Sequence, residues 1–170
     1  MKFVIEPKDL EKASVVIDEY KNSKKFKEQQ DLSFLTIKDI RELISNHENN
    51  ELFCHTLDRM IEKYKSKGMN YTVFADFTNI DVDLLRSYRN GIRKISRKDL
   101  LKIIIALRCT KDDAMLLMEK AGFSFDKNNK TELIVLCHIL NNEYDRANID
   151  DNLVHEGEPP LFEYRGFNRK

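Results

Sequence analysis

The chain has 170 residues, a mass of 20.1 kDa and equal numbers of basic and acidic side chains, 29 of each. This length fits one compact domain, or one domain with a substantial extension. No apolar run approaches the roughly 20 residues that a membrane helix needs, and the first residues lack the pattern of a signal peptide. We therefore expect a cytoplasmic protein without a membrane segment.

The first fifty residues predict a helical extension after a short extended start. Residues 2–6 have strand character, and Pro7 opens a helix whose apolar side chains recur at helical spacing. These side chains are Leu10, Ala13, Ile17 and Tyr20. The polar stretch 21–30 is interpreted as a mobile connector or an exposed helix end, and a short helix is expected from Thr36 to residues 47–50. Three roles are open for this extension, residues 1–50: it packs on the domain and enlarges the core, it forms a dimer interface, or it acts as an effector or partner module.

Residues 51–161 predict a second series of helices. The first is expected to end at residues 65–68, and its inward side chains are Phe53, Leu57, Met60, Ile61 and Tyr64. Ser96-x-x-Asp99 and Thr110-x-x-Asp113 each precede an apolar segment, as helix caps do, and Gly122 is expected to end the later helix. The segments KTELIVLCHIL and NIDDNLVHEGEPPL continue the helical pattern. The tail, residues 162–170, either packs on the domain or binds another molecule.

The stretch YTVFADFTNIDVDLLRSYRN, which begins at Tyr71, predicts two short helices joined by a tight turn. Ala75 is small enough for the two helices to cross closely, and Asn79 tolerates the positive φ that the turn needs. Asp81 is expected to cap the second helix. The inward side chains of that helix are expected to be Leu85 and Tyr88, because they lie three positions apart.

This stretch is similar to the helix-turn-helix of the Xre/Cro/repressor family. Ala75, Asn79 and Leu85 follow Tyr71 by four, eight and fourteen positions, as do the small residue, the turn residue and the buried aliphatic residue of that motif. The C-terminal segments resemble the extension of small Xre-like proteins from low-GC Gram-positive bacteria and their phages. The resemblance implies an all-α protein, with a five-helix helix-turn-helix domain within residues 51–161 and helical extensions at both ends.

Positive charge is concentrated directly after the start of this second helix. Residues 82–108 hold eight basic and two acidic side chains, whereas residues 109–170 hold eight basic and twelve acidic ones. We call residues Arg86 to Lys102 the basic cluster. Its members are Arg86, Arg89, Arg93, Lys94, Arg97, Lys98 and Lys102, with Arg108 beyond it. Such a cluster is typical of a surface that binds a polyanion, although a solvated helix face has the same composition.

The family resemblance implies a DNA-binding transcriptional regulator, such as a repressor. It puts a recognition helix, about Asp81 to Asn90, in the major groove of double-stranded DNA and the basic cluster on phosphates. The residues implied to face bases are Asp83, Arg86 and Ser87. Those implied to contact the DNA backbone are Tyr71, Arg89, Arg93, Lys94, Arg97 and Lys98. Because one motif covers little DNA, we expect a homodimer.

The front of the recognition helix departs from the family. Members usually have polar base-reading side chains there, and this chain has Asp81, Val82, Asp83 and Leu84. Phosphates repel carboxylates, although aspartate can accept a hydrogen bond from cytosine. The alternative is a protein-binding module, namely an antitoxin, an antirepressor or an inhibitor of a nucleic-acid enzyme, that uses the basic cluster on an acidic protein surface. Residues 1–50 or the tail would offer a protein partner a further surface.

The sequence contains no catalytic, cofactor or metal-binding motif, so we expect neither an enzyme nor a cofactor. The four histidines, His47, His55, His138 and His155, lack the spacing of metal ligands, and so do the three cysteines, Cys54, Cys109 and Cys137. We interpret His55 and His138 as partly buried structural histidines and each cysteine as a small buried hydrophobic residue. The methionines Met115 and Met118 are interpreted as core rather than as a dimer surface.

Overall fold

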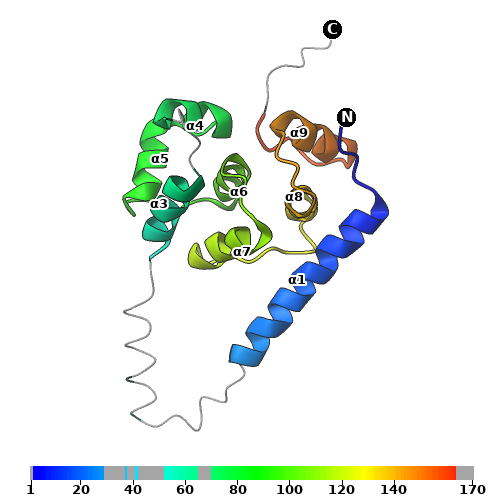
Figure 1. Ribbon diagram of the computed structural model, residues 1–170, viewed down its shortest axis with the longest axis horizontal. Coiled ribbons are helices and arrows are strands. Elements are labelled where there is room, and N and C mark those ends of the chain that lie inside the picture. The colour runs from blue at the N-terminus through cyan, green and yellow to red at the C-terminus, as the bar shows by residue number, and fades with distance from the viewer. Residues whose placement is uncertain (1, 29–36, 38–40, 42–51, 65–69, 164–170) are drawn as a thin grey trace.

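The computed structural model of the protein describes residues 2–28, 37, 41, 52–64 and 70–163 (Figure 1). These residues form eight α-helices with no strand among them, which confirms the all-α class. The helices are α1 (Pro7–Glu28), α3 (Phe53–Tyr64), α4 (Tyr71–Thr78), α5 (Val82–Arg89), α6 (Arg97–Ala106), α7 (Lys111–Lys120), α8 (Lys130–Leu140) and α9 (Arg146–His155). The helix predicted from Thr36 and the helix end predicted at residues 65–68 lie outside the described residues.

Short polar side chains determine where six of these helices begin. The predicted caps of α5, α6 and α7 are confirmed, because the side chains of Asp81, Ser96 and Thr110 accept hydrogen bonds from backbone N–H groups of the first turn. The caps of α4, α8 and α9, which sequence reasoning missed, are Asn70, Asn129 and Asp145. Each cap satisfies a backbone donor that the helix itself leaves unpaired.

Helices α6 and α8 lie at the centre of the molecule (Figure 1). Every residue from Leu100 to Ala106 in α6 is buried, and so is every residue from Ile134 to Ile139 in α8. A helix that is buried on all sides needs neighbours on all sides. Helix α6 accordingly contacts α4, α7 and α8, while α8 also contacts α1, α7 and α9. Helix α3 contacts α5 and α7, so α3 to α7 form one group beside α8.

The N-terminal helix α1 packs against α8 (Figure 1). Its predicted apolar face is confirmed, since Ala13 and Ile17 are fully buried. Helix α1 continues to Glu28, so residues 21–28 belong to a helix end and not to a connector. Residues 2–6, which have strand character in the sequence, form neither a helix nor a strand. Instead the Phe3 ring packs edge-on against His138, with 5.1 Å between ring centroids.

Candidate nucleic-acid interface

Helices α4 and α5 are joined by the turn that the sequence predicts. Asn79 has φ 51° and ψ 42°, which is the left-handed conformation that few residues other than glycine and asparagine adopt readily. Ala75 is 6% exposed at the start of this turn, and its carbonyl accepts hydrogen bonds from the N–H groups of Asn79 and Ile80. The angle between the two helices is therefore fixed by local backbone geometry.

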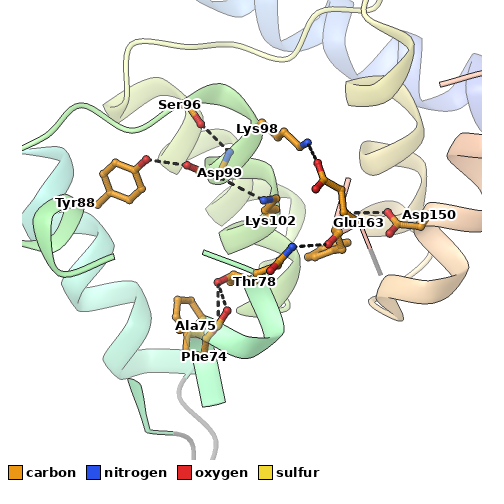
Figure 2. Close-up of polar contacts among 12 residues, drawn as sticks. Phe74, Ala75, Thr78, Tyr88, Ser96, Lys98, Asp99, Lys102, Asp150 and Glu163 are labelled. Atoms are coloured by element: carbon orange, nitrogen blue, oxygen red, sulfur yellow. Dashed lines mark hydrogen bonds and ion pairs between the residues drawn. The ribbon is translucent and has the colours of Figure 1, made fainter. Parts of the chain in front are cut away.

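Helix α5 has one face in the core and one in solvent. Leu85 and Tyr88 are 2% and 4% exposed, as predicted. The Tyr88 hydroxyl donates a 2.8 Å hydrogen bond to Asp99 in the first turn of α6 (Figure 2). Burial and this neighbouring carboxylate raise the pKa of Tyr88 to about 12. The opposite face of α5 presents Asp83 and Arg86 to solvent, and their side chains form a 2.6 Å ion pair.

Four members of the basic cluster are exposed. Arg86 lies on α5, Arg93 and Lys94 lie in the loop between α5 and α6, and Lys98 lies in the first turn of α6. Arg93 and Lys94 form no ion pair with any residue that the structure describes. Lys98 forms a 2.8 Å ion pair with Glu163 (Figure 2). The loop thus carries the two cations that are most available to an anionic partner.

Arg89, by contrast, links α5 to α3 and α4. Its Nε donates a 2.7 Å hydrogen bond to Asp58, its guanidinium also pairs with the same carboxylate, and only 17% of its side chain is exposed. The guanidinium lies 4.7 Å from the centre of the Tyr71 ring. Two residues that were expected to contact the DNA backbone, Arg89 and Tyr71, therefore stack on each other.

Arg97 and Lys102 also have partners inside the protein. Arg97 donates to the buried carboxylate of Glu132 at 2.6 Å and to the Ser124 carbonyl at 3.1 Å. Lys102 is 6% exposed and lies 3.6 Å from Asp99 (Figure 2). The expectation that the whole basic cluster lies on phosphates is therefore wrong at Lys102, because α6 is covered on all sides.

We expect Arg89→Met to lower the free energy of unfolding by about 1 kcal/mol, because it removes a partly buried charged hydrogen bond and a cation–π contact. Urea denaturation followed by circular dichroism would measure this loss. Arg86→Met is the matched control, since its i,i+3 pair with Asp83 is exposed and contributes at most about 0.5 kcal/mol. Equal stability of the two variants would show that Arg89 has no structural role.

Exposed acidic and apolar side chains lie on α4, at the start of α5 and in the loop after α5. Asp76, Asp81 and Asp83 are all exposed, and the Ser87 hydroxyl donates to the Asp83 carbonyl at 2.8 Å. Two apolar side chains, Val73 and Ile92, are 47% and 73% exposed. No local pattern identifies these two as surface residues, because isolated apolar residues in short segments normally belong to the core.

The described histidines and cysteines differ in burial. His138 is fully buried, whereas His55 is exposed, so the interpretation of His55 as partly buried is wrong. Cys109 and Cys137 are buried as predicted, and burial raises the pKa of each thiol to about 12; Cys54 is half-buried. Met115 and Met118 belong to the core, as predicted. Among the described residues, no three histidine, cysteine or acidic side chains are grouped as metal ligands would be.

Comparisons with known proteins add no relative. No protein-family model, curated protein or solved structure matches this chain. The described helices also include none with the length and apolar character that crossing a membrane requires.

Proposed function

We propose that the protein is a DNA-binding transcriptional regulator, with a five-helix domain of the Xre type formed by α3 to α7. The observation that carries this proposal is the pair of eight-residue helices α4 and α5, held at a left-handed Asn79 with an apolar inner face and a solvent-facing outer face. A helix held in this way can enter a major groove, while the loop that follows it meets phosphates. The loop cations Arg93 and Lys94 are suited to that role because no described carboxylate neutralises them.

Fewer residues are proposed to contact DNA than the sequence alone implies. Arg86, Ser87 and Asp83 remain on the face of α5 that would meet bases, and Arg93, Lys94 and Lys98 remain on the phosphate side. Arg89 and Arg97 support the fold through internal ion pairs. A homodimer would place two copies of α5 in successive major grooves, which predicts a symmetric site with half-sites about 10 base pairs apart.

The test is selection from a random pool of duplex DNA across a salt series. We expect one enriched sequence, and we expect Arg93→Gln/Lys94→Gln to weaken binding to it about tenfold at 0.1 M salt and to reduce the salt dependence by about two ions. The double variant Lys12→Gln/Lys111→Gln removes the same charge from exposed positions on α1 and α7 and should bind as the wild type does. Absence of any enriched sequence, with both double variants behaving like the wild type, would overturn the proposal.

One observation favours a second function, a protein-binding module. Asp83 neutralises Arg86, and the exposed Asp81 adds negative charge at the start of the same helix, which is unfavourable for a surface that meets phosphates. On this alternative the loop cations would contact an acidic protein surface. Capture of a protein from the host at equal yield with and without nuclease treatment, lost in Arg93→Gln/Lys94→Gln, would support it over the DNA-binding function.

A further inference from the structure

The chain after α9 turns back to the segment that joins α4 and α5. Leu161 and Phe162 are each 2% exposed, and both of their N–H groups donate to the Asp150 carboxylate, at 2.7 and 3.0 Å. The packed alternative for the tail therefore holds for Phe162, while Tyr164 to Lys170 lie outside the described residues. We call residues 158–163 the C-terminal strap.

The strap is attached directly to the turn between α4 and α5. The Asn79 side chain donates a 3.1 Å hydrogen bond to the Phe162 carbonyl, and the Phe162 ring packs edge-on against Phe77 with 6.0 Å between centroids. Arg146 of α9 donates to the carbonyls of Asp76 and Phe77. Asn79 thus both shapes the turn and holds the strap beside it, so the strap has a fixed position relative to α5.

This attachment brings one acidic side chain onto the basic cluster. Glu163 follows Phe162 directly and lies 2.8 Å from the Lys98 ammonium, where Figure 2 shows the two side chains bridging the strap and the first turn of α6. Glu163 adopts φ 53°, a left-handed conformation that costs a residue other than glycine about 1 kcal/mol. The contacts of Leu161 and Phe162 hold the strap against the domain up to this position.

We propose that Glu163 is a built-in counter-ion of Lys98, which DNA phosphate must displace, so that the C-terminal strap sets the affinity of the basic surface. The inference rests on the proposed DNA-binding function. A carboxylate and a phosphate oxygen accept the same hydrogen bonds from an ammonium group, and only one of them can occupy the same side of Lys98. Both side chains are about half exposed, 49% for Lys98 and 60% for Glu163, so the exchange requires no unfolding of the strap.

The experiment is a double-mutant cycle in DNA binding, made on the full chain with Glu163→Gln, Lys98→Gln and the double variant. Glu163→Gln should tighten binding to random-sequence duplex about threefold to tenfold at low salt, because the exchange no longer has to break an ion pair. The salt dependence should steepen by up to about one ion, so the gain shrinks as salt is added. In the Lys98→Gln background, the same substitution should change little.

The matched control is Glu158→Gln, which removes the same charge from the same strap. Glu158 accepts a 3.2 Å hydrogen bond from Thr131 rather than pairing with the basic cluster, so its loss should leave DNA affinity unchanged. The inference would be overturned if the two substitutions changed DNA affinity equally, or if Glu163→Gln still tightened binding in the Lys98→Gln background. Glu163 would then act only through the net charge of the protein. If no variant binds DNA at any salt concentration, the proposed function fails and this inference fails with it.

Discussion

Replacement of Arg97 by glutamine should lower the free energy of unfolding by about 3 kcal/mol. Glu132, its partner, has a side chain that is 1% exposed and accepts hydrogen bonds from the Arg97 guanidinium at 2.6 Å and from the Asp126 N–H at 2.8 Å. Removing one member of a buried pair leaves the other charge without its ion partner, which costs about 3–5 kcal/mol. The partial exposure of Arg97, 40%, puts the expected loss at the lower end. Urea denaturation would measure it.

The double variant Arg97→Gln/Glu132→Gln separates this explanation from a general loss of packing. It removes the buried charge as well as its partner, so it should be more stable than Arg97→Gln alone by at least about 1 kcal/mol. Arg93→Gln is the matched control, since Arg93 is exposed and should change stability by less than about 0.5 kcal/mol. If Arg97→Gln instead kept the wild-type stability and bound DNA more weakly, Arg97 would have to contact DNA phosphates, as the family resemblance implies.

The backbone features of the turn between α4 and α5 could be predicted from the sequence, but the ion-pair partners of the arginines could not. The positions of Ala75, Asn79 and Asp81 follow from backbone rules that act within a few residues, and all three predictions are confirmed. Arg97 finds its partner 35 residues away and Arg89 finds Asp58 at 31 residues, and no local pattern contains such pairs. Sequence reasoning therefore identified the cluster of basic residues but not which of them are available to a ligand.

The burial of Lys102 could have been predicted from the sequence. It stands alone among the apolar residues of LLKIIIAL, a run too continuous for a helix with one solvent-facing side. A lysine in such a run is expected to lie along the surface of a buried helix with its ammonium near a carboxylate, as Lys102 does beside Asp99. The strap is different, because its docking depends on Asn79 and Asp150, which the chain brings together only when folded.

The largest pH effect should come from His138, which is fully buried in α8. Its Nε2 lies 3.1 Å from the Asn152 amide nitrogen, which assigns the neutral ring's proton to Nδ1, and among the described residues Nδ1 has no hydrogen bond of good geometry. Burial lowers the pKa of His138 to about 4, while a hydrogen bond to the Glu143 backbone and the nearby Asp145 act in the opposite direction. The folded protein therefore resists protonation of a ring that the unfolded chain protonates near pH 6.5.

Because the folded pKa lies below the unfolded one, stability is complete at neutral pH and is lost as the pH falls from about 6.5 towards 4. Between pH 7 and pH 5 this one group should lower the free energy of unfolding by about 2 kcal/mol. His138→Phe should remove that loss from urea denaturation curves measured at the two pH values, whatever its effect on stability at pH 7. Exposed His55 provides the control, and His55→Gln should keep the wild-type pH dependence. If the stability of the wild type and of His138→Phe depended on pH in the same way, His138 would have the same pKa in the folded and unfolded states. The His138 ring would then have to reach water or a hydrogen-bond acceptor in the folded protein. For that, the edge-on contact between the Phe3 and His138 rings would have to open.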